Sequence, residues 1–169
     1  MIYETLNTIA ADANKYFARM LDVEEEKVVL SSILNADGSV AISGQNKIIF
    51  TLVNVVPNES LKNLPTDLKD RRIPVSTSHY KLSLLVSAYF NAGNYAESLQ
   101  LLSMIMSYFS DKAVFNHTNT PDMDSAIVQI RANLTVMNQE QMTTLWRGVG
   151  SPLMPSVLYE LEPILAKRY

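Results

Sequence analysis

The most constraining feature of this sequence is the segment 126–137, in which apolar and polar residues alternate. The apolar positions are Val128, Ile130, Ala132, Leu134 and Val136, and the polar positions are Gln129, Arg131, Asn133 and Thr135. A period of two places these two sets on opposite faces of a β-strand. A strand with one apolar and one polar face is typical of an antiparallel or mixed sheet, because strands of a parallel sheet are buried on both faces. We therefore expect a sheet with one buried face.

Other apolar segments predict the remaining strands. They are residues 28–33, 47–56, 79–90 and 155–165, with a shorter candidate at 40–43 and a short apolar piece at 114–115. Three segments instead repeat apolar residues at helical spacing, which predicts helices that begin near residues 2, 94 and 138. Helices and strands follow one another irregularly, so the expected fold class is α+β, a single domain of residues 1–169 in which the helices pack on one side of a mixed sheet.

The helices carry recognisable end signals. Asn94 with Glu97, and Asn138 with Gln141, have the spacing of a capping box. The apolar stripe of the second helix is expected to comprise Tyr95, Leu99, Leu102, Ile105, Met106 and Phe109. That of the first is expected to comprise Ile2, Leu6, Ile9, Ala13, Tyr16, Phe17 and Met20.

Composition excludes several classes of protein. The chain has 169 residues, a net charge of −3 and no cysteine. The negative charge argues against a protein that binds nucleic acid through its charge, and the missing thiols exclude disulfides and cysteine nucleophiles. No apolar run approaches the roughly 20 residues of a membrane span, and the first residues lack the pattern of a signal peptide. The expectation is a soluble, cytoplasmic protein that does not insert into a membrane.

The residues that carry enzyme chemistry are sparse. The two histidines, His79 and His117, lie far apart, and neither has a partner at metal-ligand spacing. Asp122 and Asp124 lack the further acids of a calcium loop, and the run 24–26 is typical of a solvated face. No glycine-rich phosphate loop occurs. We therefore expect no enzyme activity and no catalytic, cofactor or metal site, with a small-molecule-binding α+β domain as an alternative.

Several segments resemble a known family along essentially the whole chain. They are MIYETLNTIAADANKYF (1–17), KVVLSSILNADGSVAI (27–42), NKIIFTLVNVV (46–56), NAGNYAESLQLLSMIMSYF (91–109), VFNHTNTPDM (114–123) and LWRGVGSPLMPSVLYELEPI (145–164). In their order and spacing they are similar to cap proteins of contractile injection systems of the antifeeding-prophage and Photorhabdus-virulence-cassette type. The resemblance implies a fold like that of phage tail terminators, and a homo-hexameric ring at the baseplate-distal end of the particle. Such a ring stops polymerisation of the inner tube and sheath subunits and catalyses no reaction.

The resemblance leaves the details of assembly open. Some caps of this family carry a second, C-terminal domain, so the chain is expected to occupy part of the cap or to work beside a longer cap paralogue. A baseplate or tube adaptor, and a transient assembly chaperone, are alternatives within the same particle. Assembly is expected in the bacterial cytoplasm, after which the protein stays in the particle.

Two segments are the candidate protein interface. The polar loop 57–74, with Arg71 and Arg72, exceeds the usual length of an unstructured loop and is expected to reach a neighbour. The end of the chain, 163–169, alternates apolar and basic groups and includes Lys167, Arg168 and Tyr169. An extended tail of this kind is suited to adding a strand to a neighbouring sheet, and a frayed terminus is the alternative.

Overall fold

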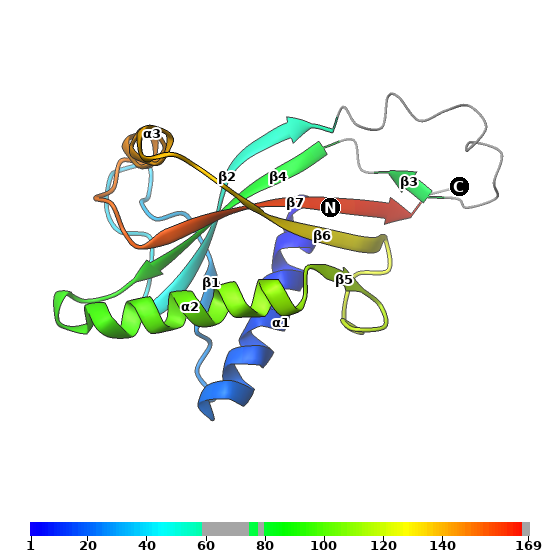
Figure 1. The fold of residues 1–169 in the computed structure, drawn as a ribbon, viewed down its shortest axis with the longest axis horizontal. Helices are drawn as coiled ribbons and strands as arrows, with labels where there is room; N and C mark the ends of the chain where they lie inside the picture. The colour runs from blue at the N-terminus through cyan, green and yellow to red at the C-terminus, as the bar shows by residue number, and fades with distance from the viewer. Residues whose placement is uncertain (59–74, 78–79, 167–169) are drawn as a thin grey trace.

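The computed structural model describes residues 1–58, 75–77 and 80–166, and within these ranges the chain builds one mixed β-sheet (Figure 1). Its strands are β1 Val28–Leu30, β2 Lys47–Pro57, β3 Val75–Thr77, β4 Tyr80–Tyr89, β5 Val114–Asn116, β6 Ile127–Thr135 and β7 Ser156–Ala166. They lie in the order β1-β2-β4-β7-β6-β5, and β3 also pairs with β7. β1 and β2 run parallel, and every other pair in this sheet is antiparallel. The predicted α+β class with a mixed sheet is confirmed.

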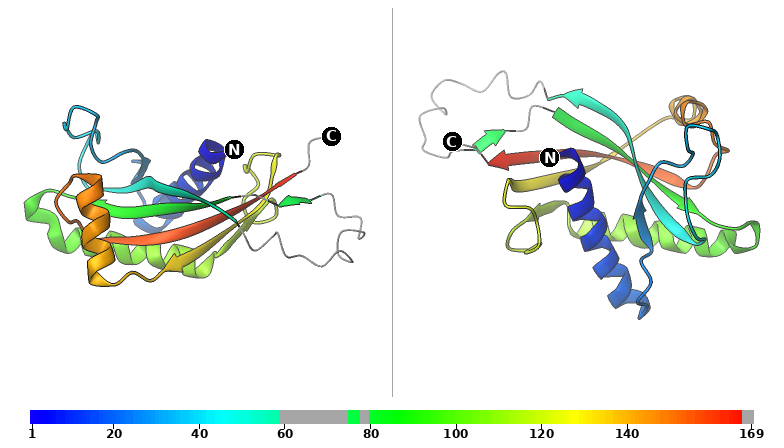
Figure 2. Two further views of the ribbon diagram at one scale, coloured as in Figure 1. Left: turned by 90° about the horizontal axis from the view of Figure 1, so that it is seen from above. Right: turned by 180° about the vertical axis from the view of Figure 1, so that it is seen from behind.

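The helices cover both faces of the sheet, not one as the sequence suggested. They are α1 Ile2–Leu21, α2 Tyr95–Asp111 after a short 3-10 turn at Ala92–Asn94, and α3 Gln139–Val149. α1 and α2 pack on the face that carries Leu84, whereas Trp146 of α3 packs with Ile49 and Leu85 on the opposite face. In Figure 1, α3 lies apart from the other two helices, and Figure 2 shows the same arrangement from above and from behind. α3 brings only one fully buried residue, Trp146, to this second face.

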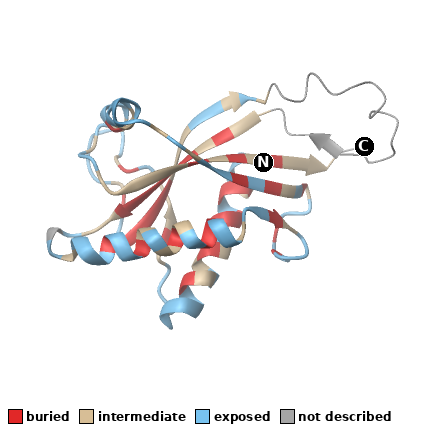
Figure 3. Cartoon of the chain, viewed as in Figure 1, coloured by how far each residue is buried: buried red, intermediate tan, exposed pale blue. Residues whose placement is uncertain are grey.

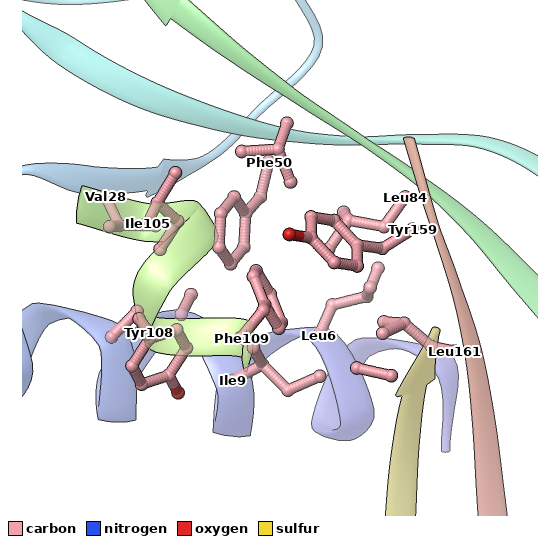
Figure 4. Packing of buried hydrophobic residues seen from close by; sticks show 14 of the residues in the cluster. Leu6, Ile9, Val28, Phe50, Leu84, Ile105, Tyr108, Phe109, Tyr159 and Leu161 are labelled. Carbon is pink, nitrogen blue, oxygen red and sulfur yellow. The ribbon is translucent and has the colours of Figure 1, made fainter. Parts of the chain in front are cut away.

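The main core lies between the sheet and helices α1 and α2 (Figures 3 and 4). Its centre is aromatic, since the ring of Phe109 stacks on that of Tyr159 at 4.2 Å between centroids. Tyr108 and Phe115 contact Phe109 edge-on. Burial of such rings supplies much of the free energy of folding, and their edge-on contacts fix how α2 lies on the sheet.

A buried hydroxyl orients α2 against α1. Tyr108 donates a 2.7 Å hydrogen bond to Asp12 of α1, which also accepts a 2.8 Å bond from Lys112. Burial, and then the bond to Asp12, raises the pKa of Tyr108, so this phenol stays protonated. This contact turns the buried face of α2 toward α1. Tyr95 and Leu99, predicted for the apolar stripe, are therefore exposed, while Leu101 and Tyr108 are buried beside the correctly predicted Ile105 and Phe109.

β6 does not keep the regular alternation seen in its sequence. Its register with β7 shifts between Ile127 and Gln129, which is the signature of a β-bulge. The bulge brings both Ile127 and Ile130 into the core and leaves Val128 exposed. Leu134 and Val136 are exposed as well, so the predicted apolar face holds only at Ile130 and Ala132.

Two smaller predictions were also wrong. The candidate strand at 40–43 is a single β-bridge between Val40 and Leu34, beyond the turn at Asn35–Gly38. The side chain of Asn94 makes no capping bond, because it turns to donate to Asn46 at 3.3 Å. The second capping box is confirmed: Asn138 accepts from the backbone of Gln141, whose side chain bonds back to Asn138.

The two asparagine positions give a matched test of capping. Asn138→Ala removes a bond to an otherwise unpaired helix N–H, and we expect it to lower the free energy of unfolding by about 1 kcal/mol. Asn94→Ala removes no such bond, so its effect is expected to be below roughly 0.5 kcal/mol. Urea unfolding followed by circular dichroism measures both, and equal losses would contradict the observed difference in capping.

An exposed carboxylate joins the segment after α1 to the start of β2. Glu25 accepts from Lys27 at 2.7 Å and from Lys47 at 2.6 Å. These two hydrogen bonds, with that from Lys27 the larger influence, lower the pKa of Glu25 from 4.5 to about 2. Because the folded state favours the charged form, this contribution to stability is complete above pH 4.5 and disappears as the pH falls toward 2.

Replacing this carboxylate should change the response to acid. We expect the stability of Glu25→Gln to fall less steeply than that of the unaltered protein between pH 4.5 and 2. Glu24→Gln, at the neighbouring exposed position, is the control and should keep the original slope. Thermal melts across this pH range measure the effect, and identical slopes for all three proteins would refute it.

Candidate interaction surface

The interface residues proposed from the sequence lie outside the described part of the chain. Arg71 and Arg72 fall within residues 59–74, and Lys167, Arg168 and Tyr169 follow the last described residue. They stay predictions. The described structure does bear on the start of the proposed tail: Pro163–Ala166 form the end of β7. Ile164 and Leu165 pair with β3 on one side and with β6 on the other, whereas Pro163 pairs with Ile130 of β6. Ala166 pairs with Val75 of β3 and donates to the carbonyl of Ala126 at 2.9 Å, so this stretch is held inside the sheet.

One outer edge of the sheet is covered by the chain itself. β1 pairs with β2 through one side, and at Val28 the other side faces α1. The side chain of Asn14 donates to the Val28 carbonyl and accepts from the Val28 N–H, both at 2.8 Å. An amide side chain here takes the place of a further strand, and it satisfies the groups that an edge strand would otherwise present.

The same edge is open further along β2. β1 is three residues long and pairs only with Ile48–Phe50, whereas β2 continues to Pro57. Ser31 donates to the carbonyl of Phe50, and beyond this bond no strand in the described ranges pairs with β2 on this side. Because the backbone groups of successive residues point alternately to the two sides, those of Leu52 point outward. Val55 also lies along this stretch, with its N–H bonded to the Asn54 side chain at 2.9 Å.

Two pockets lie at the open edge, one on each face of the sheet, and both are lined in part by Leu52. The pocket on the α3 side has a volume of about 500 Å³, and the one on the α1 side about 490 Å³. The first is lined by Ser32, Ile33, Leu34, Thr51, Leu52, Val53, Thr144, Leu145, Gly148 and Val149. The second is lined by Ile2, Tyr3, Leu6, Leu30, Ser31, Ser32, Phe50, Thr51 and Leu52. Neither lining contains a charged side chain, so this surface suits an uncharged, partly apolar partner.

The face of the sheet beyond α3 is polar. Lys81 of β4 bonds to Glu160 at 2.8 Å and to Glu162 at 2.9 Å, both on β7. These two hydrogen bonds, led by that from Glu160, raise the pKa of Lys81, so the lysine stays charged. The cluster carries one more negative than positive charge and is partly exposed, so this face remains hydrated.

In the described ranges, His117, Asp122 and Asp124, which were considered as ligands, make structural contacts. His117 donates through Nε2 to the carbonyl of Ile127 at 2.8 Å, which ties the loop after β5 to β6. Among residues 1–58, 75–77 and 80–166, no three acidic or histidine side chains converge as metal ligands. His79 lies outside these residues. Asp124 accepts from the backbone of Ala126 at 2.8 Å and caps a turn, while Asp122 forms an ion pair with Lys15.

None of the helices in the described part of the chain is long and apolar enough to cross a membrane. The open edge of β2, with its two uncharged pockets, is the candidate interaction surface. Its geometry suits contact between proteins, because it offers outward backbone groups between shallow apolar recesses.

The chain was compared with curated proteins and with solved structures. No curated protein matches it. Among solved structures, the chain is similar to the sheath/tube terminator of PVC, an extracellular contractile injection system, determined in its extended state. The two share 12% sequence identity with a TM-score of 0.56, over 94% of this chain and 57% of the terminator. The expected likeness to tail-terminator folds is therefore confirmed, and this chain spans somewhat more than half the length of that relative.

The family comparison is more specific. The sequence model of the Pvc16 N-terminal domain family matches residues 4–168, a range that begins in the first turn of α1 and extends past the end of β7. Because this match covers nearly every residue, the protein belongs to the Pvc16 N-terminal domain family.

Proposed function

We propose that this protein is a tail terminator, which forms a homo-hexameric ring on the last layer of a contractile injection particle. The ring ends polymerisation of the inner tube and the sheath at the baseplate-distal end. The observation that carries this proposal is the family match over residues 4–168, and the fold shared with a sheath/tube terminator supports it. The role is structural and requires no reaction. Its partners are further copies of the chain and the tube and sheath subunits.

The surface described above is consistent with such a role. A ring subunit needs specific contact surfaces more than an enclosed binding site, and an exposed strand edge is a surface of this kind. We further propose that it shares the cap with a longer paralogue. Assembly takes place in the bacterial cytoplasm, before the finished particle is released or anchored.

Deletion of the gene tests the terminator role. We expect particles without this protein to have overlong or ragged tubes, because nothing occupies the last layer to stop further addition of subunits. Electron microscopy of purified particles measures their length and the state of the distal end, and the chain supplied in trans should restore both. Particles of normal length with an intact cap would overturn the proposal.

The position of the protein in finished particles separates the remaining alternatives. A terminator labelled with an antibody tag should be found at the baseplate-distal end. A label at the baseplate would identify an adaptor, and a label missing from finished particles would identify an assembly chaperone.

The candidate interface segments 57–74 and 163–169 both carry basic residues near their ends, and their role is tested by removing those residues or their charge. We expect Arg71→Ala with Arg72→Ala, and separately deletion of Lys167–Tyr169, to lower the fraction of capped particles several-fold by weakening contact with tube or sheath. Glu140→Ala, an exposed change on α3, is the control. Normally capped particles from either variant would exclude that segment from the interface.

A further inference from the structure

The sheet has a second open edge, at the end of β6. β5 pairs with Gln129–Arg131 of β6, and Ala132 then donates to the carbonyl of Ala113 at 2.9 Å. Beyond Ala132, β6 continues through Thr135 without a further described strand on this side. The backbone N–H of Ala132 points to this outer side of β6. Because the backbone groups of successive residues point alternately to the two sides of a strand, those of Leu134 point outward as well. The open edge of β6 thus comprises Asn133–Thr135, and Val136 follows the strand directly.

This edge is uncharged and apolar where it is most exposed. The side chain of Leu134 is 52% exposed, and the following Val136 is 90% exposed. Asn133 and Thr135, between and beside them, are polar but uncharged. Edge strands of soluble proteins are commonly protected by charged residues or proline, and this one is not. An apolar edge of this kind is stable in water once another strand covers it.

The two open edges match in charge and in the direction of their strands. Neither the β6 edge nor the pocket linings at the β2 edge carries a charged side chain, so their contact leaves no ion unpaired. β2 is antiparallel to β4, β4 to β7, and β7 to β6, so β2 and β6 run in opposite directions. A second copy that continues the sheet in the same orientation therefore places its β6 antiparallel to β2.

The faces of the sheet match too. Leu134 pairs with Tyr159 and lies on the face covered by α1 and α2, and Val55 pairs with the buried Leu82 on that same face. Val55 is 43% exposed. If Leu134 lies opposite Val55, then Val136 comes opposite Leu52, where the two pockets meet. The register shift between Leu52 and Asn54 accounts for the unequal spacing on β2.

We propose that the segment Asn133–Val136 of one copy, which is the end of β6 and the residue after it, adds to the β2 edge Leu52–Val55 of the next copy, with Leu134 opposite Val55 and Val136 opposite Leu52. The Val55 N–H exchanges its bond to the Asn54 side chain for one to the Leu134 carbonyl, so that backbone hydrogen bonds join the two sheets. Val136 then covers the uncharged pocket on the α1 side. The contact uses two different edges of each subunit, so it is head-to-tail, which is the kind of contact that builds a ring when the rotation between copies closes. It rests on the proposed ring and names the surfaces that build it.

Engineered cysteines test this contact directly, because the chain contains none of its own. Residues directly opposite on neighbouring strands have Cβ atoms about 4.5–5.5 Å apart, close enough for a disulfide after small adjustments. Val55→Cys with Leu134→Cys is the chosen pair, since both side chains are exposed and neither change opens the core. Upon mild oxidation, of the free chain at high concentration and of assembled particles, we expect a ladder of covalent multimers on a non-reducing gel.

Matched variants make the result specific. Val55→Cys with Thr135→Cys places the second thiol on the opposite face, and we expect it to form at least tenfold less cross-linked product. A mixture of the two single variants should give dimers and no ladder, because each chain then carries one thiol. Thermal melts show that every variant is folded. Failure of the ladder in both states, or dimers from Val55→Cys alone, would overturn the proposed contact.

The particle assay distinguishes this contact from the terminator role. If the pair cross-links as expected but loss of the protein leaves particle length unchanged, the contact holds and the terminator role fails. If the protein controls particle length while the pair forms no ladder, the terminator role holds and the proposed contact fails.

Discussion

The central strand of the sheet is β7, the last strand in the described part of the chain. β7 pairs with β4 and β3 on one side and with β6 on the other, and it brings Tyr159 to the aromatic centre of the core. The sheet therefore cannot be completed until residues 156–166 are in place, which makes folding depend on contacts between distant parts of the sequence. It also explains why Pro163–Ala166 is no free arm, since Ile164 and Leu165 at its centre pair with β3 on one side and with β6 on the other.

Because β7 occupies the centre of the sheet, strands from earlier in the sequence form both of its edges. β1 and β2 close one end of the sheet, and β5 and β6 close the other. At both ends the outermost strand has three residues and lies beside a neighbour of nine or eleven. This mismatch in length leaves part of each neighbour uncovered. At Val28 the chain protects the edge with Asn14, so the bare stretches of β2 and β6 contrast with an edge that is closed by a specific pair of hydrogen bonds.

Much of the fold could be predicted from the sequence, because strand and helix periodicity are local. The alternation in 126–137 indicated a half-buried strand correctly, and the capping box at Asn138 was found from spacing alone. The features that the sequence missed depend on contacts between distant residues. The bulge at Val128 is set by pairing with β7, the rotation of α2 by the bond from Tyr108 to Asp12, and the position of α3 by the packing of Trp146 on Leu85.

The candidate site was harder to predict than the fold. Arg71, Arg72 and residues 167–169 lie outside the described residues and stay predictions, which rest on charge that is visible in a sequence. An open edge is defined instead by the lack of a partner, and it emerges only when the lengths of paired strands are compared. The short segment 28–33 beside the longer 47–56 was the available signal, but it required knowing that the two strands pair. In a subunit that assembles through its sheet, the contact residues resemble core residues, uncharged and alternating, so composition assigns them to the interior.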